Sequence, residues 1–144
     1  MENTNNALTL KDDNMIVDLA SSTNSFCSFV ADTDEAKAKL FGIANNPDNR
    51  LSDCINKKIM LKDIFVEEVQ CTNTESGELT VCPRVVLIDD KAVSYQCVSV
   101  GIFSAVKKLI AVYGMPTWEN PIPIEVKQIS KGTKKMLSLS IVTK

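Results

Sequence analysis

The order of apolar patterns after residue 57 constrains the fold of this chain more than any other feature. Segments rich in β-branched and apolar residues come first, at residues 59–69, 79–88 and 91–98. A helical pattern over residues 99–113 follows them, and two alternating segments come last, at residues 122–127 and 137–142. Runs of this kind, separated by turn residues, predict three strands, a helix and two further strands.

The helix between the strands has the clearest periodicity. Its apolar residues recur three or four positions apart, at Ile102, Phe103, Val106, Leu109, Ile110 and Tyr113. Ser99 provides an N-cap, while Gly114 and Pro116 end the helix. Three strands, a helix and two strands are typical of the OB-fold, a five-stranded Greek-key barrel. We therefore expect a mainly β domain with such a barrel over residues 57–143 and the helix between its third and fourth strands.

The residues before the barrel predict an elaboration of the same domain, over residues 25–50. Residues 25–30 are typical of a strand. Asp32 and Glu35 form a capping box for a helix over residues 36–44, which the turn residues 45–49 end. Residues 1–14 are polar and aperiodic, which indicates a disordered terminus, and the apolar piece 15–20 is too short to assign. A chain of 144 residues fits a single domain over residues 15–144.

Histidine is absent from the chain, which excludes the Ser-His-Asp and Cys-His catalytic systems and imidazole zinc ligands. The adjacent acids Glu67–Glu68 and Asp89–Asp90 would alternate faces of a strand or turn, so a divalent-metal nuclease is the least favoured alternative. Glycine-rich phosphate-binding motifs are also missing. We expect no enzyme, no cofactor and no metal site.

The cysteines are five in number and widely spaced, at positions Cys27, Cys54, Cys71, Cys82 and Cys97. An odd set with no Cys-x-x-Cys pair predicts reduced, mostly buried thiols and a cytoplasmic location. We expect no targeting signal and no membrane association, because no apolar run approaches the length of a membrane span.

Charge is distributed unevenly, although the formal net charge is only −2. Residues 1–56 carry four basic and nine acidic side chains, whereas residues 104–144 carry seven basic and two acidic ones. Lys131, Lys134 and Lys135 crowd the connection between the last two strands, a loop that OB-folds use for ligand contact. They are candidates for binding a nucleic-acid backbone, and a solvated turn is the alternative.

Arg84 and Tyr95 are candidates for a base-stacking platform. Arg84 follows Pro83 in the second barrel strand, and the Tyr95 ring in the adjoining strand would pair with it across the sheet. The alternative is structural: Arg84 forms an ion pair with a nearby carboxylate, and Tyr95 covers the barrel.

Trp118 and Lys62 complete the candidate set. Trp118 is the only tryptophan and stands between prolines, where it either stacks on a base or plugs the end of the barrel. Lys62, with Lys57 and Lys58, would extend a basic track, which Glu67 and Glu68 oppose.

Five strings in the last two thirds of the chain carry a resemblance to a known family. They are Cys54–Lys58, Leu61–Val69, Pro83–Val85, Gly101–Phe103 and Pro116–Glu119. With them, the chain resembles small single-stranded DNA-binding proteins encoded by phages and mobile elements of Gram-positive bacteria. The resemblance implies an OB-fold protein that coats single-stranded DNA, without regard to sequence, during phage or plasmid replication in the host cytoplasm.

Two kinds of protein partner are also expected. An exposed barrel strand would allow a homodimer, and replication proteins are natural partners of such a chain. The alternative function is a phage-encoded module that binds a protein, or inhibits a host factor, through the acidic N-terminal region.

Overall fold

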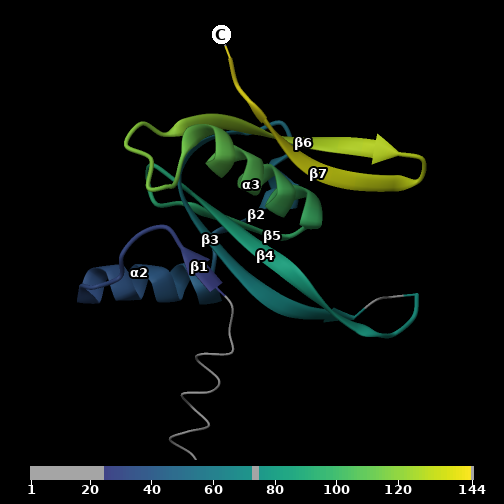
Figure 1. Ribbon diagram of the computed structural model, residues 1–144, viewed down its shortest axis with the longest axis horizontal. Coiled ribbons are helices and arrows are strands. Elements are labelled where there is room, and N and C mark those ends of the chain that lie inside the picture. The colour runs from purple at the N-terminus through teal and green to yellow at the C-terminus, as the bar shows by residue number, and fades with distance from the viewer. Residues whose placement is uncertain (1–24, 73–74, 144) are drawn as a thin grey trace, which may run out of the picture.

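The computed structural model describes residues 25–72 and 75–143, so the predictions for residues 1–14 and 15–20 lie outside the described part. Within it the chain is mainly β, with two α-helices (Figure 1). The strands are β1 (Ser25–Cys27), β2 (Asn49–Arg50), β3 (Lys58–Thr72), β4 (Leu79–Asp89), β5 (Ser94–Val98), β6 (Ile122–Lys131) and β7 (Lys134–Ile141). The helices are α2 (Asp34–Asn45) and α3 (Val100–Tyr113), with a short 3-10 helix η1 (Leu51–Cys54).

The strands form one curled, mixed sheet in the order β2-β5-β4-β3-β6-β7, with β1 added beside β3. Only β2 and β5 pair in parallel. The long strand β3 turns the corner, because Lys58–Leu61 pair with β6 while the rest of the strand pairs with β4. The pairing register with β4 shifts between Leu61 and Asp63, as at a β-bulge. The sheet thereby curls into a half-barrel.

The main core lies between the concave face of the sheet and α3, which crosses the opening of the half-barrel (Figure 1). Ile122, Ile124 and Val126 of β6 are all buried there, as their alternation predicts. A smaller core lies on the outer face, where Ile43 of α2 packs against Phe65 and adjacent residues of β4. The helix α2 therefore covers one end of the outer face and leaves the other end open, while β1 widens the sheet beside β3.

Most elements match the predicted ones. The five predicted barrel strands correspond to β3–β7, and α3 lies between the third and the fourth, with Ser99 as its N-cap and Gly114 as its C-cap. The N-cap of α2 is Thr33, whose hydroxyl accepts from the Ala36 amide, and not Asp32. The two-residue strand β2 was missed, because no sequence periodicity exists over so short a segment.

Two strand boundaries also differ from the prediction. β5 begins at Ser94 and not at residue 91, because a carboxylate oxygen of Asp89 accepts from the amides of Lys91 and Val93 and holds these residues in a turn. β6 and β7 extend further toward each other than predicted, so that only Gly132 and Thr133 connect them. Gly132 has a φ of 62°, which glycine adopts without strain. The last hairpin is therefore a long arm.

All five cysteines are free thiols, but only Cys54 is buried and the other four are half-buried. The prediction of mostly buried thiols was therefore too strong. No helix among the described residues is long and apolar enough to span a bilayer.

Alkaline pH is expected to destabilise this fold from about pH 9 upward. Burial raises the pKa of the Cys97 thiol from 9.0 to about 12. Burial, followed by the nearby Asp89 carboxylate, raises the pKa of the Tyr95 phenol from 10.0 to about 12. Above about pH 9 the folded chain therefore holds more protons than the unfolded chain, and its free energy of unfolding falls as the pH rises.

Urea unfolding followed by circular dichroism at several pH values between 8 and 11 measures this effect. A variant with Cys97→Ser and Tyr95→Phe should lose stability less steeply above pH 9 than the wild type. An equally steep loss would show that other groups cause the alkaline instability.

Candidate nucleic-acid interface

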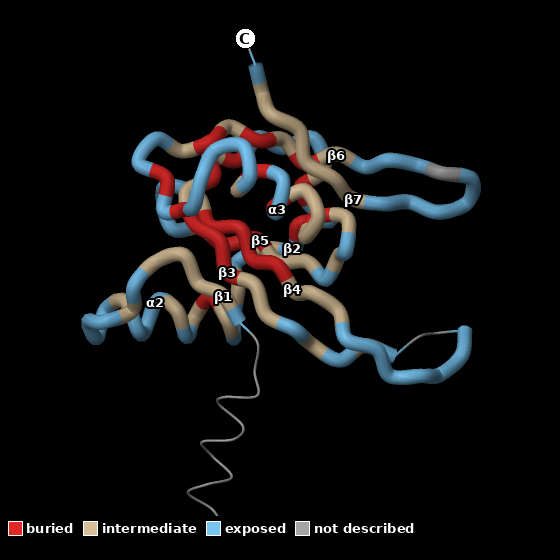
Figure 2. Tube along the Cα trace, viewed as in Figure 1, coloured by how far each residue is buried: buried red, intermediate tan, exposed pale blue. Residues whose placement is uncertain are grey.

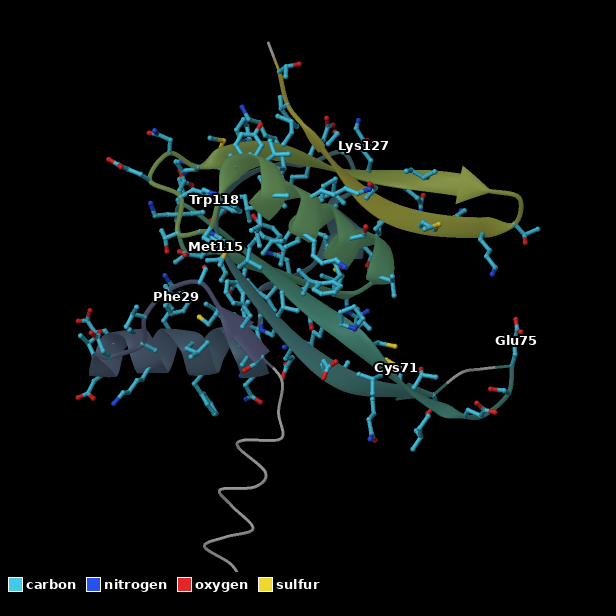
Figure 3. The ribbon with its side chains drawn as sticks, in the orientation of Figure 1. Phe29, Cys71, Glu75, Met115, Trp118 and Lys127 are labelled. Atoms are coloured by element: carbon cyan, nitrogen blue, oxygen red, sulfur yellow. The ribbon has the colours of Figure 1, made fainter. Side chains whose placement is uncertain are left out.

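Trp118 and Lys62 lie together at the end of the half-barrel away from the two hairpin tips (Figure 3). The Trp118 side chain is only 6% exposed, and its indole nitrogen donates to the Gly114 carbonyl at 3.0 Å. The Lys62 ammonium donates to the Trp118 carbonyl at 3.3 Å, and the Trp118 amide donates to the Lys62 carbonyl at 3.2 Å. These contacts favour the plugging role for Trp118 over base stacking.

Tyr95 also faces the core. It is 4% exposed, and its hydroxyl donates to a carboxylate oxygen of Asp89 at 3.3 Å. Its partner in β4 is Leu87, whereas Arg84 is opposite Val98. The expected cross-strand pair of Arg84 and Tyr95 is therefore not formed, because the two residues lie three rows apart and on opposite faces of the sheet.

Arg84 lies on the outer face of the sheet. Gln96 lies two rows away on the same face, opposite Val86. The Arg84 guanidinium donates to a Glu67 carboxylate oxygen at 2.7 Å and to the Gln96 side-chain oxygen at 3.2 Å. The ion-pair alternative is thus the arrangement found. The pair holds Arg84 in place beside an open part of the outer face.

The chain has only two arginines, and both lie on this outer face. Arg50 of β2 is exposed and pairs in register with Gln96, the same residue that accepts from Arg84. Residues paired in register across neighbouring strands point to the same side of a sheet. We call Arg50, Arg84, Gln96 and Val98 the arginine face.

A hollow of about 320 Å³ lies beside the arginine face. Its lining includes Arg50, Gln96 and Val98, together with Leu137 from β7. The arginine face therefore borders the last hairpin. Sequence reasoning missed Arg50 and Gln96, because a two-residue parallel strand leaves no pattern from which to find them.

The last hairpin is basic beyond Glu125 of β6. Lys131 pairs with Lys134 at the tip, and Ser130 pairs with Lys135; the side chain of Lys131 lies outside the described part. The side chains of Lys134 and Lys135 are exposed, as are Gly132 and Thr133 between the strands (Figure 2). No acidic residue occurs in residues 126–143. We call β6–β7 the basic hairpin.

The basic hairpin and the arginine face are continuous. Lys135 and Leu137 are two positions apart in β7 and so point to the same side of the strand. Because Leu137 and Arg50 line the same hollow, the Lys135 side of the basic hairpin leads to Arg50 at the edge of the arginine face.

The β3–β4 hairpin has the opposite charge. It carries the acids Glu67, Glu68, Glu75 and Glu78, and residues 63–83 include no lysine or arginine. Both hairpins project from the same side of the half-barrel (Figure 1). Among the described residues, no group of three or more acidic or cysteine side chains is arranged to hold a metal ion. The lysines and arginines described above are side chains suited to contact an anionic chain.

A family model described as phage single-stranded DNA-binding protein matches residues 19–142 of the chain. No curated protein and no solved structure shows a significant match.

Proposed function

Because the chain belongs to the phage single-stranded DNA-binding protein family, we propose that it binds single-stranded DNA along the basic hairpin and the arginine face. The observation that carries this assignment is the placement of Leu137, which shares a strand side with Lys135 and a hollow with Arg50, so that the cations of the hairpin and of the sheet follow one another as a track. Single-stranded DNA binding needs such a track for its backbone.

Each part of this surface has a different task. Lys134 and Lys135, with Lys131, neutralise phosphates as point charges, and Arg50 offers its planar set of donors to a phosphate or stacks on a base. Arg84, whose charge Glu67 balances, keeps Gln96 in place. Val98 is 50% exposed and provides apolar surface for a base. Contacts of these kinds do not read base edges, so binding is tolerant of sequence.

The remaining candidates have structural tasks in this proposal. Tyr95 and Trp118 fill the core, and Lys62 holds the segment that contains Trp118. The order of β3–β7, with α3 between the third and the fourth, supports an OB-type barrel. In this proposal the protein coats and protects single-stranded DNA during phage or plasmid replication.

Fluorescence anisotropy with labelled oligo(dT) tests the proposed function. At 50 mM salt the protein should bind oligo(dT) and a mixed-sequence oligonucleotide with similar affinity, and should bind a duplex of the same length more weakly. Raising the salt to 200 mM should weaken binding, with a slope in log affinity of about −0.7 per neutralised phosphate. Absence of binding at low salt, or binding that salt does not affect, would contradict the proposal.

A further inference from the structure

A second surface lies on the flank of α3 that faces the β3–β4 hairpin, away from the proposed DNA track. It is an open groove of about 770 Å³ between this hairpin, β1 and α3. Its walls are mostly apolar and include Phe26, Val81, Phe103 and Met115. Val81 is 62% exposed, and Met115 and Val100 at the rim are exposed as well. So much exposed apolar surface in one concave place is typical of an interaction site.

The charges around the groove indicate what it accepts. Glu68 stands on the strand wall beside Glu67, whose charge the Arg84 guanidinium balances, and Glu75 and Glu78 lie farther along the same hairpin. The helix wall carries Lys107, whose ammonium group lies over the Phe103 ring, 4.9 Å from the ring centroid. The negative charge around the groove is therefore on the hairpin side. The acidic β3–β4 hairpin is thus complementary to an apolar segment that carries positive charge.

The basic hairpin of a second copy has this chemistry. Ile129 and Met136 are partners across β6 and β7, and they are 45% and 43% exposed. Lys134 lies two positions from Met136 and so shares its side of the hairpin, and Lys127, which pairs with Glu125 at 3.3 Å, shares the side of Ile129. This side is opposite to that of Lys135 and Leu137, which lead along the strand to the arginine face. Lys134, at the tip, is used in both proposals.

A molecule cannot place its own basic hairpin in its own groove. The hairpin packs on the other flank of α3, where β7 lies so close that a Cβ atom on Gly101 would be 2.8 Å from the Leu137 carbonyl oxygen. Another hollow, smaller than the groove, lies between α3 and β7 on this flank. Any contact between the two surfaces must therefore join different molecules.

We propose that the Ile129–Met136 side of the basic hairpin of one molecule docks in the groove between α3 and the β3–β4 hairpin of the next. The two surfaces differ, so the contact is heterologous, and repeating it produces an open chain of molecules and not a closed dimer. It forms without DNA, so it can be tested independently of DNA binding.

Analytical ultracentrifugation of the full chain without DNA, at 50 mM salt and about 5 to 200 µM protein, tests the proposal. The wild type should show an average mass that rises with concentration beyond that of a dimer. An acceptor variant, Val81→Lys, and a donor variant, Ile129→Gln with Met136→Gln, should each associate at least about tenfold more weakly, because central apolar contacts dominate interfaces.

Matched controls separate docking from general effects. Val30→Lys introduces the same charge at another exposed valine, outside the groove, and should associate like the wild type. Circular dichroism should show the wild-type fold in every variant, because the substituted side chains are exposed.

A mixture of the donor and acceptor variants decides the geometry of the contact. The donor variant keeps an intact groove, and the acceptor variant keeps an intact basic hairpin. The mixture should therefore form a one-to-one dimer and nothing larger. A wild type that stays monomeric across the concentration range would overturn the proposal. A mixture that stays monomeric, or that grows beyond a dimer, would also overturn it.

Discussion

Replacing Arg50, Lys134 and Lys135 together by alanine should lower the affinity for oligo(dT) about tenfold to a hundredfold at 50 mM salt. These side chains are exposed and lie along the positive surface that joins the basic hairpin to the arginine face. Each lost phosphate contact also removes its counterion release, so the slope of log affinity against log salt should become shallower by about 2. Anisotropy titrations at several salt concentrations measure both quantities.

A variant with the same loss of charge elsewhere is the control. Lys37 and Lys39 in α2, and Lys91 in the turn before β5, are exposed and lie away from the proposed track. Replacing these three by alanine should change the affinity by less than about twofold, apart from weak long-range screening effects. If the two triple variants bind equally poorly, net charge and not this surface governs binding.

Replacing Trp118 by alanine should lower the free energy of unfolding by about 3 to 5 kcal/mol. The ring is buried in the main core. The segment around it is held to β3 by hydrogen bonds with Lys62 and by the Thr117 hydroxyl, which donates to the Asp63 carboxylate. The indole nitrogen would also lose its bond to the Gly114 carbonyl. Urea unfolding followed by circular dichroism gives the size of the loss.

Two further measurements separate plugging from stacking. Trp118→Phe keeps most of the apolar volume and should cost less stability than the alanine variant. Because Trp118 is the only tryptophan, its fluorescence reports directly on that position and should change little when oligo(dT) binds. Strong quenching by oligo(dT), together with weakened binding of a still-folded Trp118→Phe variant, would instead identify a base-stacking residue.

The order of elements could be predicted because each helix and each long strand has its own local periodicity in the sequence. Alternation at Ile122, Ile124 and Val126 identifies the buried side of one strand, and the spacing from Ile102 to Tyr113 identifies the buried side of a helix. Caps and turns are also local, which explains why Ser99 and Gly114 were found. The basic hairpin tip could be predicted for the same reason, because its lysines are neighbours in the chain.

The positions of the aromatic candidates could not be predicted in this way. Tyr95 and Trp118 each had an equally simple buried interpretation, and only packing distinguishes the two. The hydroxyl of Tyr95 is satisfied by Asp89 and the indole of Trp118 by Gly114, so both rings can be buried without an unpaired donor.

Local patterns in the chain are enough to define the class of elements, their order and the concentration of positive charge near the end of the chain. The folded arrangement is needed to show that Arg50, which stands outside every periodic segment, lies beside Gln96 and borders the basic hairpin. It is also needed to show that α3 separates the groove from the molecule's own hairpin. The physical reason is that periodicity specifies which side of a strand is buried, whereas register and sheet curvature determine which distant residues share a surface.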